Sequence, residues 1–67
     1  MEKDELQVNL NYLVSKYIKD DALIEQLKIQ IVNNKAKYVL AEIDRNKVEA
    51  FSEADIDLIK DIAFYFC

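Results

Sequence analysis

Apolar residues recur at helical spacing along most of the chain, and the pattern predicts four helical segments. In the first, about residues 4–18, apolar side chains occupy one side of a helical wheel. Asp4 precedes this stripe as a candidate N-cap, and Glu5 suits the positive end of the helix dipole. We therefore expect a helix that begins near Asp4 and packs one side into a core. The predicted core residues are Leu6, Leu10, Leu13, Val14 and Tyr17.

The second segment opens on Asp20 and Asp21 and closes on Asn33 and Asn34. Asparagine tolerates the left-handed backbone conformation, so the Asn pair can end a helix where no glycine is present. Residues 27–31 also alternate between apolar and polar with period two, which is typical of a strand. The helical core stripe of this segment is Leu23, Ile24, Leu27 and Ile31.

The third segment, residues 35–46, is compatible with two structures. Ala36, Val39, Leu40 and Ile43 have the spacing of one helix face. Alternatively, residues 38–43 pair with residues 48–51 across a turn at 44–47. We predict the helix and keep the hairpin as the alternative.

The fourth segment has the clearest start signal. Ser52 and Asp55 have the spacing of a capping box, with Asp in the place of Glu or Gln. Phe51 and Ile56 stand at the two positions of a hydrophobic staple. The predicted core stripe then continues to the end of the chain through Ile56, Ile59, Ile62, Ala63 and Phe66.

Together these segments predict an all-α fold: one small domain over residues 1–67, built as a bundle of three to four short antiparallel helices. The chain contains no glycine and no proline, the residues that tight hairpins use most. The alternative is an α+β fold with a small hairpin or meander at 27–51 flanked by two helices.

The residue inventory argues against catalysis. The chain has no histidine, no glycine and a single cysteine, Cys67. It therefore lacks an imidazole acid–base group, a phosphate-binding glycine loop and a thiolate metal cluster. Asp55 and Asp57 match only the first step of a calcium loop. We expect no enzyme activity, no cofactor and no metal site.

The net charge of −4 and the pI near 4.6 argue against nonspecific binding to nucleic acid or to anionic membranes. The acidic start of the chain is unlike a signal peptide, and its apolar runs are too short to span a membrane. We expect a cytoplasmic protein. The excess of Lys over Arg, together with many Ile and Asn, is typical of an AT-rich genome such as that of a low-GC bacterium or a phage.

The main functional signal is a surplus of apolar residues. Hydrophobic residues make up 52% of the chain, more than one core-facing side per helix requires. Val8 and Tyr12 lie opposite the first core stripe, Ile29 and Val32 lie outside the second, and Phe64 falls among charged residues of the fourth. Such positions are either enclosed by the rest of the fold or offered to a partner, so we expect a protein interface and favour a homodimer.

Acidic residues gather in the last third of the chain, where Glu49, Glu53, Asp57 and Asp61 recur every four residues. This stripe is either a solvated helix face or the rim of an interface, with Asp57 and Asp61 beside Phe64. The sequence thus predicts a non-catalytic regulator or inhibitor that docks on a larger protein through apolar and aromatic residues with an acidic rim.

A nucleic-acid-related role is the alternative function. One form is an acidic decoy that occupies a DNA-binding groove, and the other is a weak helix-turn-helix reader. A reader would use the cationic residues around the third segment, which are Lys35, Lys37, Arg45 and Lys47.

Overall fold

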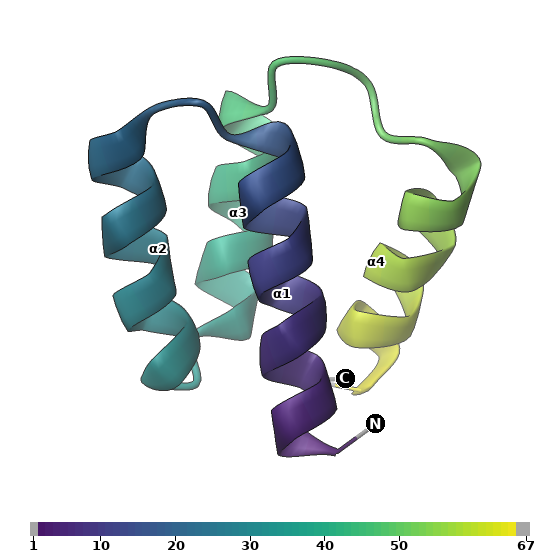
Figure 1. Cartoon of the computed structure of the whole chain (residues 1–67). Helices are drawn as coiled ribbons and strands as arrows, with labels where there is room; N and C mark the ends of the chain where they lie inside the picture. The colour runs from purple at the N-terminus through teal and green to yellow at the C-terminus, as the bar shows by residue number, and fades with distance from the viewer. Residues whose placement is uncertain (1, 66–67) are drawn as a thin grey trace.

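The structure, a computed structural model, describes residues 2–65 and contains four α-helices in that range. They are α1 (Lys3–Tyr17), α2 (Asp21–Val32), α3 (Ala36–Asn46) and α4 (Glu53–Tyr65). Consecutive helices run in opposite directions (Figure 1). No strand occurs within the described residues, so the all-α prediction is confirmed and the hairpin alternative is wrong.

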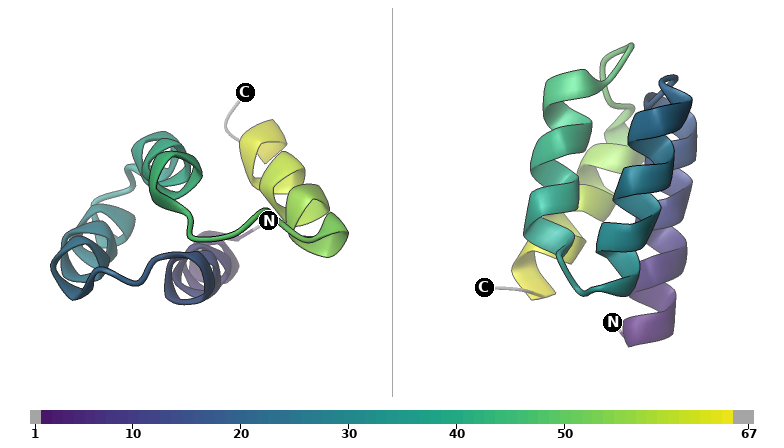
Figure 2. Two further views of the ribbon diagram at one scale, coloured as in Figure 1. Left: turned by 90° about the horizontal axis from the view of Figure 1, so that it is seen from above. Right: turned by 90° about the vertical axis from the view of Figure 1, so that its left-hand side faces the viewer.

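The first three helices pack together, and α4 lies along the side of α1 away from α2 (Figures 1 and 2). Their apolar sides share one core, to which α4 contributes Ile62. The buried positions of α1 match the sequence pattern, because every predicted core residue of this helix is buried. The buried core consists of Leu6, Leu10, Leu13, Val14, Tyr17, Ile18, Leu27, Ile31, Ala36, Val39, Ile43 and Ile62.

The predicted boundaries of α2 are confirmed at both ends. The Asp20 carboxylate accepts hydrogen bonds from the backbone N–H groups of Ala22 and Leu23. At the other end, Asn34 has φ of 62°, the left-handed conformation. The N–H of Asn34 donates to the carbonyl of Ile31, and the next N–H, of Lys35, reaches back to the carbonyl of Gln30. These two bonds form a Schellman motif with Asn in place of glycine.

The predicted N-cap of α1 is wrong by two residues. The helix begins at Lys3, with Glu2 at the N-cap position, and Asp4 lies inside the first turn. No side-chain cap bond is formed at this end. The acidic residues Asp4 and Glu5 lie in the first turn, where the helix dipole favours negative charge.

The core-facing side of α4 differs from the predicted stripe. Ile62 is buried and Ile59 is half-buried, as expected, but Ile56 is 39% exposed and Ala63 is exposed. Phe66 lies outside the described residues. The inward side instead carries the carboxylate of Asp55, so the helix is rotated away from the phase that its apolar residues alone favour.

Candidate functional site

A seam between α1 and α4 organises the polar and aromatic side chains of the molecule. On α1, Glu5, Tyr12 and Lys16 follow one another at spacings of seven and four residues, which places them on one side of the helix. Tyr12 and Lys16 contact α4 near its first turn, and Glu5 shares a groove with residues near its last turn. The seam is closed by hydrogen bonds at the first end and open at the second.

The closed end is built around the buried carboxylate of Asp55. Its Oδ1 accepts a hydrogen bond from the Tyr12 hydroxyl at 2.9 Å. Its Oδ2 accepts one from the Lys16 ammonium at 2.7 Å and another from the Tyr17 hydroxyl. The Asp55 side chain is 4% exposed, whereas that of Lys16 is 38% exposed, so solvent reaches the cation but not the carboxylate. Three donors from α1 therefore hold one acceptor of α4.

These contacts stabilise the charged form of both partners. The Lys16 ammonium, followed by the Tyr17 hydroxyl, holds the pKa of the Asp55 carboxyl well below its usual range, against the opposing effect of burial. The hydrogen bond to Asp55 raises the pKa of Lys16 above its usual range. The pair therefore stays ionised across the physiological pH range.

Tyr17 also fixes the connection from α3 to α4. Its hydroxyl accepts a hydrogen bond from the backbone N–H of Ser52 at 3.1 Å, and its backbone carbonyl accepts one from the N–H of Val48 at 3.0 Å. The Phe51 ring packs edge-on against the Tyr17 ring, with centroids 4.7 Å apart. One buried tyrosine thus positions the start of α4.

The predicted capping box is only half formed. The Ser52 hydroxyl accepts a hydrogen bond from the N–H of Asp55 at 3.2 Å, as expected for an N-cap. The reciprocal bond is replaced, because the N–H of Ser52 donates to Tyr17 and the Asp55 carboxylate is bound by α1. Asp55 is therefore a tertiary contact and not a local cap.

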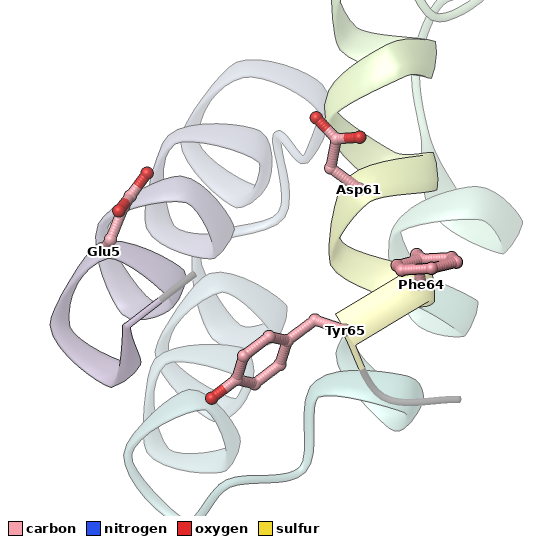
Figure 3. A pocket seen from close by; sticks show the side chains of 4 residues that line it. All are labelled: Glu5, Asp61, Phe64 and Tyr65. Atoms are coloured by element: carbon pink, nitrogen blue, oxygen red, sulfur yellow. The ribbon is translucent and has the colours of Figure 1, made fainter.

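The open end of the seam is a groove of about 610 Å³ between α1 and the end of α4. Figure 3 shows its four lining side chains: Glu5 from α1, and Asp61, Phe64 and Tyr65 from α4. In that view Asp61 and Tyr65 extend from α4 to the side on which α1 lies. The groove thus combines carboxylates from two helices with two aromatic rings.

Two predicted interface residues, Phe64 and Asp61, meet at this groove, and a third, Asp57, is exposed one turn earlier on α4. Phe64 is 84% exposed, the highest value among the large hydrophobic residues described. Asp57, Asp61 and Phe64 stand at positions i, i+4 and i+7, so they form one exposed stripe along α4. We call these three residues the α4 stripe.

The other predicted interface residues lie elsewhere. Val8 is exposed on α1, and Tyr12 is 45% exposed although its hydroxyl is bound to Asp55. Ile29 and Val32 are exposed together on the outer side of α2, where the fold leaves them unenclosed. They line a shallow groove of about 300 Å³ with Glu25, Lys28 and Asn33.

Two of the four cations around α3, Arg45 and Lys47, have acidic partners on that helix. Arg45 forms an ion pair with Glu42 at 3.3 Å, and Lys47 forms one with Asp44 at 2.9 Å. Lys47 also lies 5.1 Å from the centroid of the Phe51 ring. This region therefore carries less available positive charge than its sequence indicates.

Sequence reasoning missed Glu5 and Tyr65 at the open end, and Lys16 and Tyr17 as partners of Asp55. Helical spacing places Glu5, Tyr12 and Lys16 on one side of α1, but it does not indicate which helix faces that side. Asp55 directly precedes the apolar stripe that begins at Ile56, and this position could have indicated a buried contact. A capping box with Ser52 explains the same position equally well.

Comparison with family models, with curated proteins and with solved structures finds no match to this chain. None of the helices described in residues 2–65 is long and apolar enough to cross a membrane. The same residues hold no group of three or more side chains suited to binding a metal ion.

Proposed function

We propose that this protein is a non-catalytic binding module that docks on a larger, basic protein through the α4 stripe. The observation that carries the proposal is the exposure of Phe64, at 84%, beside the carboxylates of Asp57 and Asp61. A large aromatic ring left in water is typical of an interface residue, because burying it on a partner removes a large apolar area from solvent. The two acids select a partner whose apolar pocket is bordered by Lys and Arg.

This arrangement suits the recognition of a helix in a groove. The spacing i, i+4 and i+7 presents the α4 stripe along one line of the helix, as in other helices that dock into grooves. The hydrogen bonds on Asp55 fix α4 to α1 before any partner binds. A binding surface held in place loses less conformational freedom on association, and this favours tight binding by a small domain.

The test is affinity capture from the native host with matched variants. Phe64→Ala removes the aromatic ring, Asp57→Asn with Asp61→Asn removes the rim charge, and Val48→Ala is the control at an exposed apolar site outside both proposed surfaces. We expect a basic protein that is retained by the wild type and the control, lost with Phe64→Ala, and eluted from the wild type by moderate salt. Capture of the same proteins by all variants contradicts the proposal.

An inhibitor that imitates nucleic acid is the form of this proposal that the acids on α4 favour. Glu53, Asp57 and Asp61 are exposed and follow at intervals of one turn, about 6 Å along the helix. A basic surface that normally holds DNA would accept such a row of negative charges. If the captured partner binds DNA, addition of a DNA duplex should displace the wild-type protein, whereas a partner unaffected by DNA identifies another kind of basic surface.

Self-association is the second part of the proposal, and we assign it to the outer side of α2. Ile29 and Val32 form its apolar centre, while Glu25 and Lys28 carry opposite charges at its border. A second copy in antiparallel orientation can place each Glu25 near the other copy's Lys28, so the face is complementary to itself. Light scattering should give a dimer for the wild type and a monomer for Ile29→Glu, and a wild-type monomer at high concentration contradicts this part.

A further inference from the structure

We propose that the open end of the α1–α4 seam receives an arginine side chain of the bound partner. This inference rests on the proposed function, because the groove adjoins the α4 stripe through Asp61 and Phe64. It names the group on the partner that is recognised there, and it adds Glu5 and Tyr65 to the binding surface. These two residues are not on the α4 stripe, and Glu5 belongs to another helix.

The charges of the groove fit a cation. Glu5 and Asp61 line it from different helices, so a guanidinium bound in the groove would be attracted by carboxylates of both helices. Among the described residues, neither carboxylate takes part in a hydrogen bond or an ion pair. Lys16, which lies on the same side of α1 as Glu5, is bound to Asp55 at the closed end of the seam. The negative charge at the open end is therefore available to a partner.

The aromatic rings favour arginine over lysine. Phe64 and Tyr65 line the same groove as the two acids, so a bound cation would also lie near a ring. The guanidinium group is planar, stacks on aromatic faces and is weakly hydrated, whereas an ammonium is a compact and strongly hydrated charge. The groove volume of about 610 Å³ falls in the range of sites for small ligands, so it can hold the whole side chain.

The test uses small probes on the isolated protein, so it needs no knowledge of the partner. N-acetyl-arginine amide is titrated against the ¹⁵N-labelled chain and followed by NMR, with the lysine and citrulline amides as comparisons. Citrulline keeps the shape of arginine without its charge. We expect saturable shifts at Glu5, Asp61, Phe64 and Tyr65, at millimolar probe, with affinity for arginine at least three-fold above that for lysine and no saturation with citrulline.

Matched variants then separate the groove from general acidity. Glu5→Gln and Asp61→Asn should each weaken arginine binding three-fold or more, whereas Glu49→Gln removes the same charge from an exposed residue outside both proposed surfaces and should leave it unchanged. Shifts spread over all acidic residues, equal affinity for lysine, or equal loss with Glu49→Gln would overturn the assignment.

The outcome also distinguishes this inference from the proposed function. If capture of the partner depends on Phe64 but is unchanged by Glu5→Gln, and arginine binding does not saturate, the α4 stripe remains the docking surface and the arginine site is refuted. Saturable arginine binding at the groove together with capture that ignores Phe64 supports the site and refutes docking through the α4 stripe. If the NMR signals of Glu5 and Tyr65 shift with protein concentration when no probe is present, a second copy of the chain occupies the groove. That result would also overturn the assignment.

Discussion

Two tyrosines that donate to the same carboxylate should contribute very differently to stability. Tyr17 and Tyr12 both donate a hydroxyl hydrogen bond to Asp55. Tyr17 is 1% exposed and also accepts from the N–H of Ser52, whereas Tyr12 is 45% exposed and lies beside the Lys16 ammonium. Tyr17→Phe and Tyr12→Phe delete the same atom from these two environments, so each variant is the control for the other.

The stability cost of each substitution depends on which polar groups lose a hydrogen-bond partner and on whether water can replace it. Deleting the Tyr17 hydroxyl removes a buried hydrogen bond to a charged acceptor, which is worth about 1.5–3 kcal/mol, and takes the acceptor from the N–H of Ser52. Ser52 is exposed, so water partly replaces that acceptor, and we expect Tyr17→Phe to cost about 2–3 kcal/mol. Water can reach the site of the Tyr12 hydroxyl, so Tyr12→Phe should cost less than about 1 kcal/mol.

Urea unfolding followed by far-ultraviolet circular dichroism measures both costs. A domain of this size gains only about 3–5 kcal/mol from its core, so Tyr17→Phe should lose most of its stability. Its melting temperature should fall by roughly 8–24 °C, at about 4–8 °C per kcal/mol. Equal costs for the two variants, or a larger cost for Tyr12→Phe, would refute the assignment of Asp55 as a buried acceptor held mainly by Tyr17.

Three further predictions concern other parts of the fold. The pKa of Asp55 is lowered on folding, so its contribution to stability should be complete above pH 5 and be lost as pH falls below about 4, the usual pKa of Asp. The free energy of unfolding in urea, measured at pH 7 and at pH 2.5, should therefore differ less for Asp55→Asn than for the wild type. At Asn34, the left-handed backbone should make Asn34→Ala about 1 kcal/mol less stable in urea unfolding, whereas Asn34→Gly should be neutral or stabilising. Leu13→Ala, at a fully buried position, should cost about 2–5 kcal/mol in urea unfolding, most of the stability expected for a domain of this size.

Local chemistry made much of the helical framework predictable. Asp20 caps α2 through bonds to N–H groups two and three residues ahead, so the signal and its effect lie within four residues. Asn34 ends the same helix by taking the backbone conformation that asparagine tolerates. The core side of α1 was predictable for a similar reason, because its apolar residues repeat with the helical period and the core covers that side.

The orientation of α4 was not predictable, because a contact distant in sequence decides it. The bonds on Asp55 join residues 38 to 43 positions apart, and no local pattern reports such a pairing. The local pattern predicted a core stripe that begins at Ile56, and it assigned Asp55 to a capping box with Ser52. The groove was missed for the same reason, since Glu5 and Tyr65 come together only when α4 lies against α1.

The polar contacts at the closed end also determine what the open end presents. Apolar packing constrains the rotation of a helix loosely, because several neighbouring residues can exchange places in the core. A buried carboxylate with three donors in fixed positions permits one orientation, since turning Asp55 outward would leave the Tyr17 hydroxyl without its acceptor. In that orientation Ile56 is partly exposed and Phe64 faces solvent, an arrangement that stability alone does not favour. We infer that the Asp55 contacts contribute specificity as well as stability, because they hold the α4 stripe and the groove in the one arrangement that the proposed partner would recognise.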